Sequence, residues 1–162
     1  MIARDPRDVA VSYFHYRFHR AHLTQETWLH RLTPYSVRDL YFRWRYFDQF
    51  ATQTAEEWNT FVLSGADACN VVIRYEDLLA SETRQIRRLS TAFDIPFSLD
   101  AAEKAAQYCS FSEMQKREQK EDKGSQAKEN ERFFRKGTSG QWSEYFTAPT
   151  LHQFEQRAKK RM

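Results

Sequence analysis

The strongest strand signal in this chain is a short run rich in β-branched residues, Asn70–Arg74 (NVVIR), and a helix start follows it directly. Successive valine and isoleucine residues favour an extended strand, whereas the segment from Tyr75 to Leu79 begins a helical turn. A strand that passes straight into a helix is typical of α/β proteins, where the carboxyl ends of the strands face a ligand crevice. Tyr75 stands at such a strand end, although a partly buried tyrosine without a binding role is the commoner case.

Most of the remaining chain is patterned for helices. Asp5 is a good N-cap and Pro6 suits the first helical position, so a helix is predicted from Pro6 to about His19. A capping box at residues 36–39 predicts a second, long helix that ends near residue 54. Shorter helices are predicted at 26–32, 81–93, 100–109, 110–117 and 150–162.

The segment from Gln115 to Arg132 contains many charges and almost no large apolar residue. It cannot bury much surface, so it is predicted to be a mobile loop. No linker or internal repeat divides the chain, and residues 1–162 are predicted to form a single domain. That domain is expected to be incomplete, because only Met1–Ala3 precede the first basic motif, whereas a phosphate-binding loop usually follows a complete strand.

Composition argues against several classes of partner. The formal net charge of +3 is too small to demand a nucleic acid. The sequence shows no apolar run long enough to span a bilayer and no signal peptide, so a cytoplasmic protein without a membrane partner is predicted. The two cysteines lack metal-like spacing. His15, His19 and His22 share a helical face, but packing explains histidines in an aromatic helix more often than metal binding does, so no metal is predicted.

Two basic motifs lie near the ends of the chain, at residues 4–12 (RDPRDVAVS) and 133–142 (FFRKGTSGQW). In the first, Arg4 offers a planar fork of donors beside a helix start, and Ser12 lies two helical turns beyond the cap. In the second, Gly137 and Gly140 permit a tight turn that exposes backbone N–H groups beside Arg135 and Lys136. Both motifs suit a phosphate. On spacing alone, however, a capped helix and an ordinary surface loop explain them as well.

Taken together, these pieces resemble the sulfotransferases that use 3′-phosphoadenosine 5′-phosphosulfate (PAPS). Four blocks occur in the order of that family, at residues 4–13, 75–78, 109–114 and 133–142. Each block is modest alone, but their order and spacing are specific, and they cover essentially the whole chain. The resemblance implies an α/β fold related to the P-loop nucleotide kinases. This chain would form part of its three layers, a parallel sheet with helices on both faces, and would be rich in helix.

The resemblance also implies which residues hold the nucleotide. The first and last blocks would bind the 3′-phosphate of PAPS, or of its product adenosine 3′,5′-bisphosphate (PAP). The second and third blocks would contact the adenine, by stacking on Phe111 in particular, although ordinary helix packing is the likelier role of a phenylalanine considered alone. The implied nucleotide-binding residues are Arg4, Ser12, Tyr75, Cys109, Ser110, Phe111, Met114, Phe133, Phe134, Arg135, Lys136 and Gly137.

Two parts of the family pattern are missing from this sequence. The lysine-bearing loop for the phosphosulfate and the histidine that acts as general base belong upstream of Arg4, so no catalytic residue is assigned here. The implied reaction transfers a sulfuryl group to a hydroxyl or amine of a small-molecule acceptor, and the chain alone is expected to be inactive. A non-catalytic PAP-binding module and a nucleotide kinase relative are the alternatives. The acceptor and the oligomeric state stay open, as does whether the aromatic residues of 13–18 and 35–50 line an acceptor pocket or fill the core.

Overall fold

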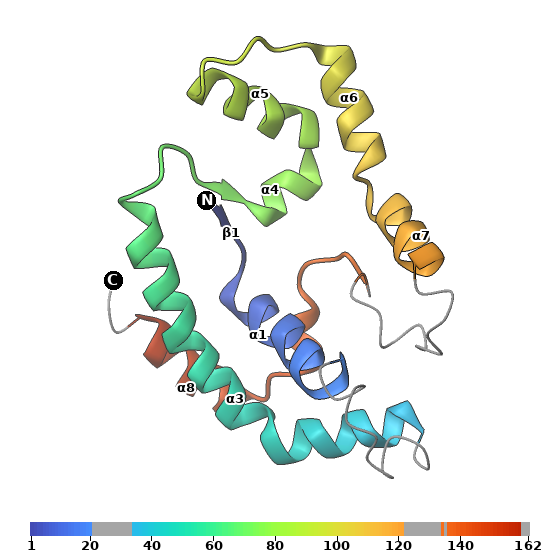
Figure 1. Cartoon of the computed structure of the whole chain (residues 1–162). Coiled ribbons are helices and arrows are strands. Elements are labelled where there is room, and N and C mark those ends of the chain that lie inside the picture. The colour runs from blue at the N-terminus through green and yellow to red at the C-terminus, as the bar shows by residue number, and fades with distance from the viewer. Residues whose placement is uncertain (21–33, 122–133, 135, 160–162) are drawn as a thin grey trace. The chain divides into compact units, whose positions relative to one another are not determined.

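The computed structural model describes residues 1–20, 34–121, 134 and 136–159 (Figure 1). The helix predicted at 26–32 lies outside the described residues. Contacts divide the chain into two compact units. Unit 1 comprises Met1–Arg4 and Val62–Gln126, and unit 2 comprises Asp5–Phe61 and Ala127–Met162. Each unit is therefore discontinuous in sequence.

Unit 1 contains a parallel pair of very short strands. Strand β1 (Ile2–Ala3) pairs with β2 (Ile73–Arg74), with Ile2 opposite Ile73 and Ala3 opposite Arg74. The Met1 ammonium extends the pairing by donating to the Val71 carbonyl at 2.7 Å. The strand predicted over Asn70–Arg74 is thus shorter than expected, because β1 offers only two strand residues to pair with it. The parallel pairing agrees with the predicted α/β class, and the larger three-layer sheet stays a prediction.

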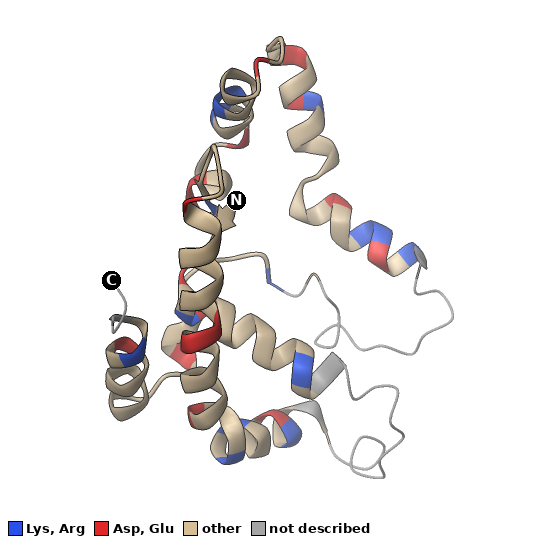
Figure 2. Ribbon diagram, turned by 60° about the vertical axis from the view of Figure 1, so that its left-hand side comes forward, with Lys and Arg blue, Asp and Glu red and all other residues tan. Residues whose placement is uncertain are grey.

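Among its described residues, unit 1 also contains the helices α4 (Tyr75–Ala80), α5 (Glu82–Ala92), α6 (Leu99–Tyr108) and α7 (Phe111–Glu121). They confirm the helices predicted from the periodicity, but α7 continues past its predicted end. Residues 115–121 are helical, so the prediction of a loop starting at Gln115 is wrong for this part. Its residues are good helix formers, and pairs such as Glu113 with Lys116, 2.6 Å apart, support the helix. Both signs of charge occur along α7 (Figure 2).

Unit 2 is built on α1 (Pro6–His15), which continues into a π-helical turn (Tyr16–Arg20). The Asp5 carboxylate caps α1 by accepting a hydrogen bond from the Arg7 backbone N–H at 2.9 Å, as predicted. Helix α3 (Tyr35–Ala66) is longer than predicted, because residues 55–66 contain no proline and include good helix formers. A short 3₁₀ helix, η4 (Gln141–Glu144), and α8 (Ala148–Lys159) follow near the C-terminus.

The core of unit 2 is largely aromatic. Phe14 of α1 and Phe47 of α3 meet edge to face, with ring centroids 5.2 Å apart, and neither is more than 2% exposed. The buried cluster consists of Ala10, Val11, Phe14, Phe47, Ala51, Ala55 and Phe154. Core packing therefore accounts for part of the aromatic content of α1 and α3. Other aromatic side chains remain outside the core, and Trp44 is 80% exposed.

Candidate functional site

In unit 1, the structure brings together Arg4 and Tyr75, the two predicted residues that follow the strands. The parallel register pairs Ala3 with Arg74, so the next residue on each strand lies at the same edge of the sheet. The Arg4 guanidinium lies over the Tyr75 ring, with its central carbon 4.6 Å from the ring centroid. A cation–π contact of this kind holds a flexible arginine in one orientation. Both side chains are half-buried.

The third predicted block forms the corner between α6 and α7. Cys109 ends α6, where its backbone N–H donates to the Ala105 carbonyl at 2.9 Å, and its thiol is free and the residue exposed. Ser110 precedes α7, and its carbonyl accepts a hydrogen bond from the Met114 backbone N–H at 3.0 Å. Phe111 begins α7 and is half-buried. The predicted adenine segment is therefore a well-defined helix–helix corner within unit 1.

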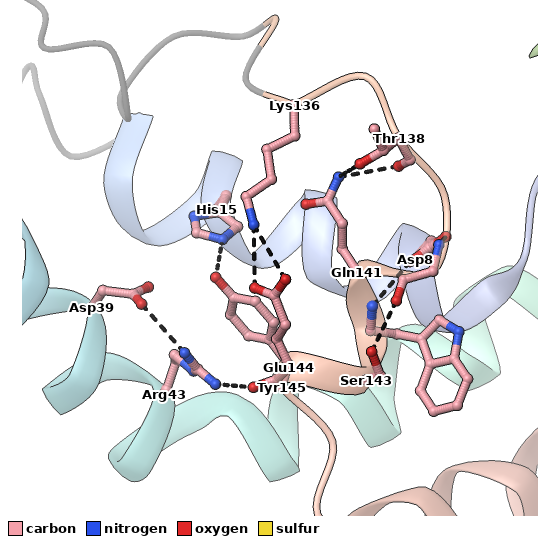
Figure 3. A network of polar contacts seen from close by, with 12 residues as sticks. Asp8, His15, Asp39, Arg43, Lys136, Thr138, Gln141, Ser143, Glu144 and Tyr145 are labelled. Atoms are coloured by element: carbon pink, nitrogen blue, oxygen red, sulfur yellow. Dashed lines mark hydrogen bonds and ion pairs between the residues drawn. The ribbon is translucent and has the colours of Figure 1, made fainter.

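In unit 2, Ser12 lies on α1 with an exposed side chain. Gly137 and Gly140 have left-handed φ angles of 63° and 84°, as the turn predicted after Lys136 requires. Lys136 forms an ion pair with Glu144, with Nζ 3.1 Å from Oε2 (Figure 3). Phe134 is half-buried. The remaining predicted members of the block, Phe133 and Arg135, lie outside the described residues.

A polar network joins α1 to the segment that follows this turn (Figure 3). The buried Asp8 carboxylate accepts hydrogen bonds from the backbone N–H groups of Gly140 and Trp142, at 2.6 Å and 3.1 Å. His15 hydrogen-bonds the Tyr145 hydroxyl, which gives this buried histidine a packing partner. Sequence reasoning placed Asp8 only in the first turn of a helix and missed its long-range role. The one available signal was Gly140, the residue before η4. Glycine has no side chain to cap a helix, so the cap has to come from another residue.

The electrostatics at the start of α1 are dominated by Asp5 and Arg7. Their side chains form a salt bridge of 2.7 Å. Partial burial alone would raise the pKa of Asp5, but the hydrogen bonds and charge of Arg7 outweigh it, so the pKa lies below its ordinary value. The same hydrogen bond raises the pKa of Arg7. The Arg7 guanidinium also lies over the Trp142 ring, 3.9 Å from its centroid, which extends the contacts between α1 and the last block.

Comparison with known proteins decides the family. The family model of the sulfotransferase domain matches residues 1–162. The chain belongs to the sulfotransferase domain family. This sulfotransferase chain is 27% identical over 159 residues to Sulfotransferase 6B1 of Danio rerio, covering 96% of the chain and 49% of that protein. It is 26% identical over 171 residues to Sulfotransferase 1A1 of Canis lupus familiaris, covering 99% of the chain and 53% of that protein.

Solved structures show the same fold. The crystal structure of a mouse sulfotransferase complexed with PAP superposes with a TM-score of 0.63 at 24% identity, over 96% of this chain and 54% of that one. Retinol dehydratase in complex with androsterone and PAP gives a TM-score of 0.59 at 21% identity, over 98% of this chain and 45% of that one. The chain thus spans about half the length of these relatives.

The comparisons confirm the family resemblance that the four sequence blocks carried. Both of these solved structures contain PAP, the nucleotide that the family resemblance led us to expect. Among the described helices, none is long and apolar enough to cross a membrane.

Proposed function

We propose that this chain supplies the 3′-phosphate and adenine contacts of a PAPS-dependent sulfotransferase. The observation that carries the proposal is the parallel register of β1 and β2, which sets Arg4 and Tyr75 side by side at the carboxyl edge of the strands. Strand ends of this kind are where α/β proteins bind nucleotides. Membership of the sulfotransferase domain family supports the choice of nucleotide.

Arg4 contributes the planar, permanently charged donor group that suits a phosphate. Tyr75 holds the guanidinium in one orientation, so that less side-chain freedom is lost when the phosphate binds. Because Arg4 covers one face of the Tyr75 ring, the adenine meets the hydroxyl edge or the opposite face. Phe111, at the α6–α7 corner, provides a second aromatic group against which a base can stack.

Unit 2 contributes a set of donors that also fits a phosphate. Ser12 presents a hydroxyl, Lys136 an ammonium, and the turn at Gly137 can expose backbone N–H groups. Lys136 remains 41% exposed in its ion pair with Glu144, so an incoming phosphate can reach it. Arg135, Phe133 and Phe134 complete the block by resemblance to the family.

PAPS supplies an activated sulfuryl group, which passes to a hydroxyl or amine of the acceptor as PAP is released and the acceptor proton is lost. The residues named above hold the nucleotide and take no part in bond making. We assign neither the general base nor the bridging-oxygen lysine to any residue of this sequence, so the chain alone binds nucleotide without transferring sulfate. The acceptor is a small molecule, by analogy with the androsterone in the retinol dehydratase structure.

Calorimetric titration with PAP and with adenosine 5′-monophosphate (AMP) tests the proposal. The chain should bind PAP more tightly than AMP, and Arg4→Ala should abolish this preference. Arg84→Ala is the matched control, because it removes an exposed arginine of α5 that has no proposed role at the site. Equal affinity for the two nucleotides, or no binding of either, would reject the proposal. Measurable sulfate transfer by the purified chain would instead show that it carries a catalytic group that we have not assigned.

A further inference from the structure

Asp8 is a buried carboxylate that connects two distant parts of unit 2. It lies in the first turn of α1 and is only 2% exposed. Its Oδ2 accepts a hydrogen bond from Gly140 N at 2.6 Å, and its Oδ1 accepts one from Trp142 N at 3.1 Å (Figure 3). Taking a carboxylate out of water is costly unless hydrogen bonds compensate it. These two bonds are therefore strong, charge-assisted contacts across more than 130 residues of sequence.

The two N–H groups belong to the start of η4. The first N–H groups of a helix have no partner within the helix and usually receive one from a polar side chain at the N-cap. The N-cap of η4 is Gly140, which has a left-handed φ of 84° and no side chain that could accept a hydrogen bond. Asp8 supplies the missing acceptor from α1. It thereby caps η4 from a different element and attaches the end of the turn that begins at Lys136.

Two further contacts hold η4 and the residue after it against α1. The Arg7 guanidinium lies over the Trp142 ring, and His15 at the end of α1 hydrogen-bonds Tyr145. The contacts thus extend along α1 from its first turn to its last. Ser12 lies on the same helix, between these anchor points. Its position relative to the turn at Lys136 and Gly137 is fixed as long as Asp8 holds Gly140.

We propose that Asp8 is a positioning residue that holds the Lys136–Gly140 turn on α1, so that Ser12 and Lys136 bind the same 3′-phosphate. This proposal rests on the proposed function. Asp8 acts through backbone N–H groups and does not touch the nucleotide, whose negative charge would repel it. The proposal explains why a site for an anion contains a buried anion of its own.

The test compares the full chain with its Asp8→Asn variant. Asparagine keeps the size of the side chain but replaces one acceptor oxygen with an NH₂ group that faces a backbone N–H donor. The control is Glu57→Gln, which removes the same charge from an exposed position on α3. Two quantities are measured: the affinities for PAP and AMP by calorimetry, and the hydrogen-exchange rates of the Gly140 and Trp142 amides by NMR.

In Asp8→Asn, we expect the affinity for PAP to fall about tenfold or more, the typical effect of losing a charge-assisted hydrogen bond. The affinity for AMP should change much less, because AMP lacks the 3′-phosphate. Exchange of the two amides should become faster, and the control should behave like the parent chain. Asp8→Glu retains two acceptor oxygens and should recover part of the lost PAP affinity.

An equal loss of affinity for PAP and for AMP in Asp8→Asn would overturn the proposal, because it would mean that Asp8 serves only the general fold. Unchanged amide exchange in Asp8→Asn would also overturn it. If Asp8→Asn does not fold, the parent chain decides: exchange at Gly140 and Trp142 no slower than at the exposed Ser139 would overturn it, and clear protection would support it. Failure of the parent chain to bind PAP would reject the proposed function, whereas the exchange data would still show whether Asp8 holds the turn.

Discussion

Replacing Glu144 by glutamine should strengthen nucleotide binding. Lys136 Nζ lies 3.1 Å from one carboxylate oxygen of Glu144 and 3.5 Å from the other, and the two side chains are 41% and 58% exposed. A phosphate that uses Lys136 must displace this carboxylate. An exposed ion pair contributes about 0–1 kcal/mol, so removing the competitor should raise the affinity for PAP by up to about fivefold. The contact between Arg43 and the Glu144 carbonyl is kept, because only the side chain changes.

The assay is calorimetric titration of PAP into the parent chain and Glu144→Gln, with Glu57→Gln as a control for the lost negative charge. The gain should shrink as the salt concentration rises, because salt screens an exposed pair. It should also disappear when Lys136 is replaced by alanine in both chains. Weaker binding by Glu144→Gln, or the same gain without the Lys136 ammonium, would refute the reasoning.

Two further outcomes concern stability. Phe14→Ala should lower the free energy of unfolding by about 3–5 kcal/mol, because it empties a fully buried aromatic site. Phe93 is 56% exposed, so Phe93→Ala should lower the free energy of unfolding far less. Urea denaturation of both variants would check the difference. The folded-state pKa of Asp5 is depressed, so its contribution should be fully present above its unfolded pKa of about 3.9 and be lost as the pH falls through the folded pKa. Acid unfolding followed by circular dichroism should show that Asp5→Asn loses less stability over this pH window than the parent chain does. An identical dependence of stability on pH in the two chains would contradict the depressed pKa of Asp5.

Helix α3 begins at Tyr35, one residue before the Ser36 of its predicted capping box, but at other helices local sequence signals predicted the start, because a cap acts within a few residues. The Asp5 cap of α1 is one example, since the donor that it satisfies is the backbone N–H of Arg7. The ends of helices were harder to predict. Helix α3 passes its predicted end near residue 54 and α7 passes the expected loop start at residue 115, because propensity and packing extended both where no strong stop signal occurs.

Long-range pairing set the limit of prediction at the candidate site. The order of the four blocks identified the family, yet it could not reveal that Arg4 stacks on Tyr75, which depends on the register of two strands about 70 residues apart. The role of Asp8 was hidden for the same reason. An aspartate in the first turn of a helix is already explained by the helix itself, so the residues around Asp8 do not indicate that it accepts a hydrogen bond from Gly140. The glycine that precedes η4 was the one signal of a missing cap.

The capping of η4 by Asp8, a residue of a different helix, has a consequence for folding during protein synthesis. Asp8 emerges from the ribosome 132 residues before Gly140, its first hydrogen-bond partner. At typical rates of elongation this interval lasts roughly 7–26 s. During that time α1 is already made, but the Asp8 carboxylate has to take its hydrogen bonds from water in place of Gly140 and Trp142. Unit 2 can therefore close only after residue 142 has been translated, and a chain released before residue 140 lacks both backbone donors to Asp8 and the Trp142 ring that Arg7 contacts.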